Sequence, residues 1–161
     1  MLLVMNEALP RRGFSFFAVQ GPGWILLAYL IIAQGLTALS YDLGVSMGTQ
    51  ERAEAITEVG TAFFYGFAFA DLVIYIPLLL IGLIGHLRGT RWGRVSLIAA
   101  LGITVYWPVV CLAALVDVRG AAGWNMGSEA PYWIALTAIA VWGAWGLVAV
   151  ALEAQGERAS R

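Results

Sequence analysis

The chain has 161 residues, of which 61% are hydrophobic and 12% are charged, and its formal net charge is −1. Soluble domains carry about 25% charged residues, so this composition predicts a membrane protein and gives no reason to expect a nucleic-acid partner. The chain has no lysine, one cysteine and one histidine, which excludes a Schiff base, a dithiol redox centre and bis-histidine haem ligation, so we expect no cofactor and no metal.

Four apolar runs are each long enough to cross a bilayer as a helix, which takes about 20 residues. Apolar residues are continuous in these runs and do not alternate, which argues against the strands of a membrane barrel. We therefore predict an all-α polytopic membrane protein, with a single domain over residues 1–161 whose short connections make it an antiparallel four-transmembrane-helix bundle. The predicted helices cover residues 23–43, 61–85, 95–116 and 132–152.

Basic residues are divided unevenly between the two sides of the predicted bundle. Two of the nine arginines, Arg52 and Arg119, lie in the two loops of one side, and the other seven lie at the termini and in the central loop. The positive-inside rule therefore places both termini and the central loop in the cytoplasm. We expect a multi-pass protein of a bacterial-type inner membrane, with an endomembrane as the alternative.

The first predicted helix carries a polar stripe formed by Gln34, Thr37 and Tyr41. Asp42 follows near the outer end of this helix, where the simplest interpretation is a capping residue in contact with water. Gln34 has a depth similar to that of Asp71 in the second helix. It is the natural partner of Asp71 if that acid has a structural role.

Asp71 is the most unusual residue of the second predicted helix. It lies about ten residues from the start, or ~15 Å deep, which is near the bilayer midplane. An ionised aspartate there costs about 2.5–3.5 kcal/mol, so we expect Asp71 to face the bundle interior. Tyr75 shares its face one turn later, and Pro77 removes a backbone donor and predicts a kink. Asp71 is therefore either part of a functional site or a structural hydrogen-bonding group between helices.

The third predicted helix repeats this combination of a polar side chain and a proline. Pro108 frees the carbonyl of Thr104, and a threonine hydroxyl can help to satisfy such a group. Two kinked helices that face each other favour a pocket. We expect Asp71, Tyr75, Thr104 and Tyr106 to converge there, in a mostly apolar pocket with few polar groups.

Five short stretches within about residues 24–150 form a recognisable pattern: Asp42-Leu43, FAFADLVIYIP from Phe67 to Pro77, Arg88-Gly89 with Trp92, Thr104 to Pro108, and Ala130-Pro131-Tyr132. Together they resemble the EXPERA group of four-helix membrane proteins, which includes the sigma-2 receptor and the emopamil-binding sterol isomerase. The sequence departs from that group in three places, of which one is a shorter first outer loop. Asp71 stands where the family has a glutamate, and Leu101 stands where it has a histidine, which counts against sterol isomerase activity.

The resemblance implies a pocket between the helices that is reached from the bilayer and binds sterol-like or amine-bearing amphiphiles. It also implies that Asp42 pairs with a ligand cation and that Asp71 is a protonated acid that holds Asp42. The cavity-lining residues that it implies are Thr104, Tyr106, Trp107 and Tyr132.

We therefore predict intramembrane binding of a small hydrophobic or amphipathic ligand. The expected binding residues are Gln34, Asp42, Asp71, Tyr75, Thr104, Tyr106, Trp107 and Tyr132, and no catalytic residue is assigned. The expected partners are a lipid or sterol-like small molecule, the membrane, and a second copy or a larger membrane complex.

Two other classes of function stay open. One is an acid–base lipid isomerase, with Asp71 as the acid and Asp42 or Tyr75 as its partner. The other is a structural or assembly subunit of a membrane complex, in which small residues of the last helix let a partner approach closely: Thr137, Ala140, Gly143 and Ala144.

Overall fold

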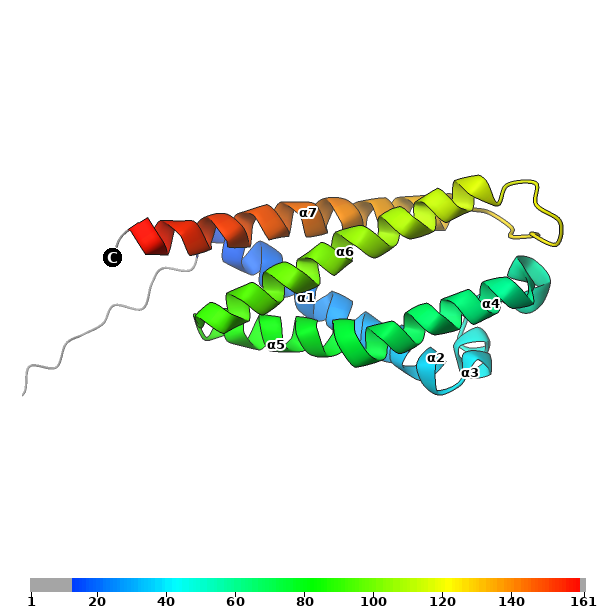
Figure 1. Cartoon of the computed structure of the whole chain (residues 1–161), viewed down its shortest axis with the longest axis horizontal. Helices are drawn as coiled ribbons and strands as arrows, with labels where there is room; N and C mark the ends of the chain where they lie inside the picture. Colours follow the sequence, from blue (N-terminus) through cyan, green and yellow to red (C-terminus); the bar gives the residue numbers. More distant parts are fainter. Residues whose placement is uncertain (1–12, 160–161) are drawn as a thin grey trace, which may run out of the picture.

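The structure, a computed structural model, describes the backbone of residues 13–159 and the side chains of residues 13–156. All regular secondary structure within these residues is helical. Four helical spans are long and apolar enough to cross a membrane: Phe14–Leu39, Ala53–Leu87, Arg91–Asp117 and Ala130–Gly156 (Figure 1). The predicted all-α membrane protein with four spanning helices is thus confirmed. Four arginines that contribute to the predicted orientation lie outside the described side chains: Arg11, Arg12, Arg158 and Arg161.

Two of the spans contain a π-helical turn. The first span consists of α1 (Phe14–Leu30), η1 (Ile31–Gly35) and α2 (Leu36–Leu39), and the short helix α3 (Tyr41–Ser46) follows it. The second span consists of α4 (Ala53–Ala70), η2 (Asp71–Tyr75) and α5 (Ile76–Leu87). The other two spans are α6 (Arg91–Asp117) and α7 (Ala130–Ala159). Figure 1 shows α3 and the α6–α7 loop at one end of the molecule, which we call the α3 end, and the α5–α6 turn at the other, the turn end.

The first helix starts earlier and ends earlier than the predicted range of residues 23–43. Pro22 lies inside α1, because loss of one backbone donor does not stop a membrane helix. Gly23 gives room for Leu83 of α5, whose Cδ2 would lie 2.7 Å from a Cβ at this position. At the other end Ser40 is extended, with φ −158° and ψ 119°, and terminates the helix. Asp42 therefore lies in α3 and not in the spanning helix.

Directly before Pro77, where the sequence predicts a kink, the second span contains the π turn η2. Pro77 has no N–H to donate back along the helix, and the N–H of Ile76 bonds to the carbonyl of Asp71, five residues earlier. The turn η1 of the first span lies against η2. Single π turns inside α-helices occur frequently at functional sites. The two adjacent π turns therefore make this level of the bundle a candidate for a functional site.

Packing is tight at the turn end and looser at the α3 end. The most extensive interfaces join α6 to α7 and α5 to α6, and α1 packs on α5 and α7. Five leucines in this part are fully enclosed: Leu30, Leu79, Leu83, Leu97 and Leu101. In contrast, α4 packs on α2 and η1 of the first span and has no extended interface with α6 or α7. Figure 1 shows α4 diverging from α6 toward the α3 end.

The α5–α6 turn brings two helix backbones into direct contact. Gly89 has a φ of +68°, which suits glycine, and Thr90 caps α6 by accepting a hydrogen bond from the N–H of Gly93 at 3.2 Å. The hydroxyl of Thr90 also donates to the carbonyl of Gly85 at 2.9 Å. A Cβ at Gly93 would overlap the backbone of Gly85, so only glycine fits there.

Gly93→Ala should therefore lower the free energy of unfolding by about 1–3 kcal/mol, because the backbones of α5 and α6 would have to separate. Gly66→Ala is the matched control, since a Cβ at Gly66 has no atom within 4 Å and alanine favours the helix there. Thermal unfolding in detergent, followed by circular dichroism, measures both variants. Equal melting temperatures for Gly93→Ala and the wild type would contradict the close α5–α6 contact.

Candidate functional site: an acid beside an intramembrane hollow

The first residue of η2, Asp71, is buried, with 9% of its surface exposed. None of the hydrogen bonds or ion pairs of the described residues involves its carboxyl group. Asp71 lies close enough to interact electrostatically with three side chains: Tyr29 of α1, Tyr75 of η2 and Cys111 of α6. The acid therefore lies where three of the four spans converge, and it has no protein partner there.

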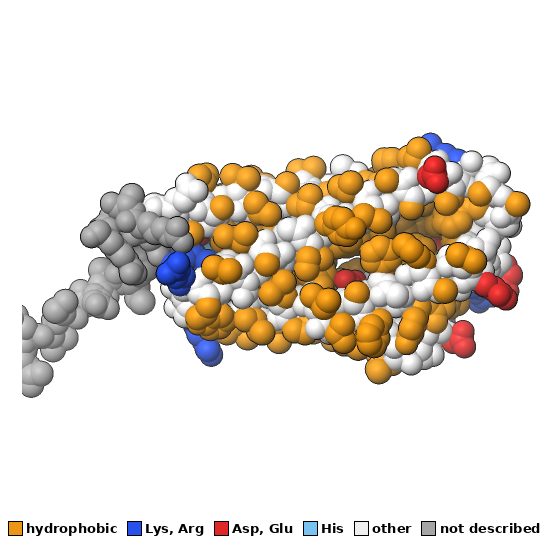
Figure 2. All heavy atoms as spheres, in the orientation of Figure 1, with side chains coloured by type: hydrophobic (Ala, Val, Ile, Leu, Met, Phe, Trp, Pro, Cys, Tyr) orange, Lys and Arg blue, Asp and Glu red, His pale blue; other side chains and the backbone are white. Residues whose placement is uncertain are grey.

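The face between α4 and α6 is hollowed, and acidic atoms are visible inside the hollow (Figure 2). Asp71 is the only acidic side chain that is buried among the described residues. Its position in η2, where α4 departs from α6, matches the level at which the bundle opens. We therefore describe the candidate site as Asp71 and the hollow beside it.

The hydroxyl groups of Tyr75 and Thr104 bond to each other and fasten η2 to α6. The two oxygens are 2.5 Å apart, and the Thr104 hydroxyl donates its proton to the carbonyl of Ala100 at 2.9 Å. A hydroxyl has one proton, so Tyr75 must be the donor to Thr104. Both side chains are fully buried, at 1% and 0% exposure. The predicted convergence of these residues near Asp71 thus takes the form of an internal bridge.

Trp107 of α6 provides a second polar group without a partner. Its indole N–H is buried and has no hydrogen-bond partner within the described part of the chain. The N–H faces the hydroxyl of Tyr75 but does not meet hydrogen-bond geometry with it. An acid that can accept and an indole that can donate therefore both lie near Tyr75.

The first span does not supply a partner for Asp71. The side-chain oxygen of Gln34, the expected structural partner, accepts a hydrogen bond from Gln50 at 3.3 Å. Asp42 is exposed at the start of α3, because the chain leaves the helix at Ser40. The arrangement implied by the family resemblance, in which Asp71 holds Asp42, is not formed in this structure.

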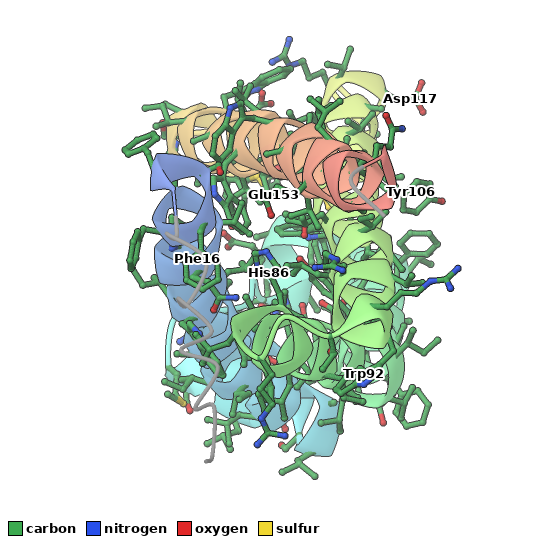
Figure 3. All side chains as sticks on the ribbon, turned by 90° about the vertical axis from the view of Figure 1, so that its left-hand side faces the viewer. Phe16, His86, Trp92, Tyr106, Asp117 and Glu153 are labelled. Atoms are coloured by element: carbon green, nitrogen blue, oxygen red, sulfur yellow. The ribbon has the colours of Figure 1, made fainter. Side chains whose placement is uncertain are left out.

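Two other predicted site residues do not contact Asp71. Tyr106 is 66% exposed, and Figure 3 shows its side chain pointing away from the bundle. Tyr132 is half-buried near the start of α7, where its hydroxyl donates to the carboxylate of Glu51. Of the predicted site residues, the structure brings together Asp71, Tyr75, Thr104 and Trp107.

A polar cluster that the sequence analysis did not predict lies toward the turn end, where Figure 3 shows His86 and Glu153 pointing toward each other. We call it the histidine cluster, and it consists of Ser15, Gln20, Trp24, His86 and Glu153. These residues belong to α1, α5 and α7 and are separated by up to 138 positions, so no local sequence pattern predicts their contact. The predicted start of the first helix at residue 23 also left Ser15 and Gln20 outside the bundle.

The hydrogen bonds of the histidine cluster fix its proton positions. The indole of Trp24 can only donate, and it donates to Gln20 Oε1 at 2.9 Å, so Gln20 Nε2 must donate to His86 Nδ1 at 3.1 Å. Nε2 of neutral His86 then carries the proton and donates to Glu153 Oε2 at 3.2 Å. Ser15 donates to the other oxygen of Glu153 at 2.9 Å. With every group engaged, the cluster joins three helices and offers no free base or nucleophile.

Fully buried leucines separate the two polar regions. Tyr75 and His86 are eleven residues apart along the second span, or ~16 Å. Leu79 and Leu83 fill the intervening turns of α5, and Leu97 and Leu101 of α6 pack in the same apolar core, all at 0% exposure. The described residues therefore provide no continuous polar path along the bundle axis.

Comparisons with protein-family models, with curated proteins and with solved structures find no match for this chain. No group of three or more His, Cys, Asp or Glu side chains is placed to hold a metal ion within the described residues. The function therefore has to be derived from the site itself.

The Tyr75–Thr104 bridge predicts unequal effects of two conservative substitutions. Thr104→Val leaves the buried Tyr75 hydroxyl without an acceptor and should cost about 1–3 kcal/mol of stability. Tyr75→Phe should cost less, about 1 kcal/mol, because Thr104 keeps its bond to Ala100. Reversible unfolding in mixed micelles measures both. A larger loss for Tyr75→Phe than for Thr104→Val would show that the proton is not donated as described.

Proposed function

We propose that this chain is an integral membrane protein that binds a small hydrophobic or amphipathic molecule in the hollow beside Asp71. The observation that carries the proposal is a buried acid with no protein partner at a hollow between helices. Such an acid costs about 2.5–3.5 kcal/mol inside a bilayer, and ionisable residues at this depth mark substrate and ion sites. The indole N–H of Trp107, which lies near Tyr75, is a further polar group close to this acid.

The proposal includes an antiparallel bundle with both termini in the cytoplasm of a bacterial-type cell. Arg88, Arg91 and Arg94 support this orientation, because they lie at the turn end or in the first turn of α6. The α3 end carries several acids: Asp42, Glu51, Glu54 and Glu58. The hollow then belongs to the half of the bundle that is farther from the cytoplasm.

The chemistry of the site supports a sterol-like or amine-bearing amphiphile as the ligand. Asp71 can accept a hydrogen bond from a hydroxyl or an ammonium group, and Tyr29 adds an aromatic ring close to it. Apolar side chains make up most of each span, as a hydrophobic ligand body requires. The resemblance of the second-helix motif to the EXPERA group supports the same ligand class, although the exposed position of Asp42 departs from it.

The alternatives receive less support from the site. An acid–base isomerase needs two groups within reach of the substrate, but Tyr75 is committed to Thr104 and His86 to the histidine cluster. A proton or ion pathway is opposed by the buried leucines between the two polar regions. An assembly subunit would need the small residues of α7 on its lipid-facing side. One of them, Gly143, instead packs against Thr104 inside the bundle.

Native mass spectrometry with lipid extraction, on the wild type and Asp71→Asn, tests the proposal. We expect a discrete hydrophobic molecule to accompany the wild type and to bind about ten- to a hundredfold more weakly to the variant, as the loss of a charge-assisted hydrogen bond requires. Asp42→Asn is the matched control, because it makes the same substitution at an exposed acid and should retain the molecule.

Two results would overturn the proposed function. One is the same molecule bound equally to wild type and Asp71→Asn. The other is bulk lipid alone in all three proteins, with Asp71→Asn merely less stable than the others, which would make Asp71 a structural group.

A further inference from the structure

A short segment at the α3 end connects α3 to α7. It lies in the half of the bundle where α4 diverges from α6, which we call the open half. The carboxylate of Glu51, just before α4, accepts the hydroxyl proton of Tyr132 in α7. The backbone carbonyl of Glu51 accepts a second bond, from the hydroxyl of Tyr41 in α3, at 2.8 Å. Burial raises the pKa of Tyr41, and the charge of Glu51 adds to this effect, so Tyr41 stays a neutral donor. Glu51 therefore joins α7 to the α3 side of the molecule.

The Glu51–Tyr132 bond lies on the route from the α3 end to Asp71. Tyr132 is close enough to Tyr29 and Tyr41 to interact with them electrostatically, and Tyr29 is similarly close to Asp71. The polar groups thus follow one another from Glu51 through Tyr132 and Tyr29 to the site. Because α4 has no extended interface with α6 or α7, few other contacts close this part of the bundle.

The first turn of α4 is separated from the rest of the helix. Thr57 has φ 70° and ψ 164°, a conformation that is rare for a β-branched residue and marks local strain. Its hydroxyl accepts a hydrogen bond from the N–H of Gly60 at 3.3 Å, as an N-cap residue does, so the continuous part of α4 starts after Thr57. Residues 53–56 therefore form a separate turn that joins the long helix at one residue, Thr57.

The α6–α7 loop bonds to the first turn of α4, residues 53–56. The N–H of Asn125 donates to the carbonyl of Ala55 at 2.8 Å. Within the same loop region, Arg119 donates to Glu129 at 2.6 Å and lowers the pKa of that carboxyl group below its usual value. The loop is thus fastened near α7, and its bond to Ala55 is a second link across the open half.

We propose that residues 47–57, which we call the cap segment, close the hollow against the aqueous phase at the α3 end, with the Glu51–Tyr132 bond as a latch and Thr57 as the hinge. With the latch closed, the hollow between α4 and α6 is open to the surrounding lipid, and water is kept from Asp71. Breaking the latch removes the bond of the cap segment to α7, leaves its bond to the α6–α7 loop, and admits water from the α3 end. The inference rests on the proposed function only in treating the hollow as a ligand site.

Cys111 makes the latch testable without any ligand. It is the only cysteine of the chain, it is half-buried, and it lies close enough to Asp71 to feel its charge. A charged, water-soluble maleimide reaches Cys111 only where water does. Its route from the turn end is blocked by the buried leucines. The rate of labelling in lipid nanodiscs therefore reports aqueous access from the α3 end.

We expect Tyr132→Phe to label at least fivefold faster than the wild type, because the ring is kept and only the bond to Glu51 is lost. Glu51→Gln should label at the wild-type rate, since the amide oxygen can still accept from Tyr132. Tyr106→Phe is the matched control, because Tyr106 is exposed on α6 and should not affect the rate. Labelling in denaturant gives the full extent for each protein, and thermal unfolding shows that each variant is folded.

Equal labelling rates for Tyr132→Phe and the folded wild type would overturn the latch, and so would rapid labelling of the wild type itself. Rapid labelling of Glu51→Gln would also overturn it, because the hydrogen bond would then not be what closes the cap. These outcomes are distinguishable from failure of the proposed function, which is read from the molecule bound to wild type and Asp71→Asn.

Discussion

Hydrocarbon offers no hydrogen bonds, so every polar group inside a membrane bundle has to find its partner within the protein. Most of the buried polar side chains in the described residues do so. Thr37 donates to the carbonyl of Ala33 at 2.6 Å, Tyr75 bonds to Thr104, and the histidine cluster engages each of its members. Asp71 and the indole N–H groups of Trp107 and Trp124 are exceptions, and Trp124 lies in the α6–α7 loop, outside the spans. Asp71 and Trp107 both lie close to Tyr75.

The geometry around this site follows from a few backbone features. Pro77 cannot donate to the preceding turn, and the π turn η2 accommodates it and places Asp71 at the point where α4 separates from α6. Toward the turn end, glycines at positions 85 and 93 let α5 and α6 meet backbone to backbone. The bundle is thus tightly packed toward the turn end and hollowed between α4 and α6. This asymmetry supports a binding site and opposes a path across the membrane.

The sequence predicted the four spans and the inward-facing position of Asp71, because long apolar runs and an isolated acid are strong local signals. It did not predict that Thr104 and Tyr106 point in different directions, although residues two apart on a helix lie about 200° from each other. The end of the first helix at Ser40 carries no distinctive signal either, so Asp42 was expected at the outer end of the spanning helix and not in α3. The histidine cluster depends on contacts between three distant segments, which only the fold brings together.

Asp71 has no hydrogen-bond partner among the described residues, and we propose that it is kept for a ligand. The melting temperature of Asp71→Leu beside the wild type, both freed of bound molecules by extensive detergent exchange, tests this role. An unpaired acid in an apolar surrounding destabilises the fold, so Asp71→Leu should melt at the wild-type temperature or above it. A melting temperature several degrees lower would instead make Asp71 a structural bridge between helices.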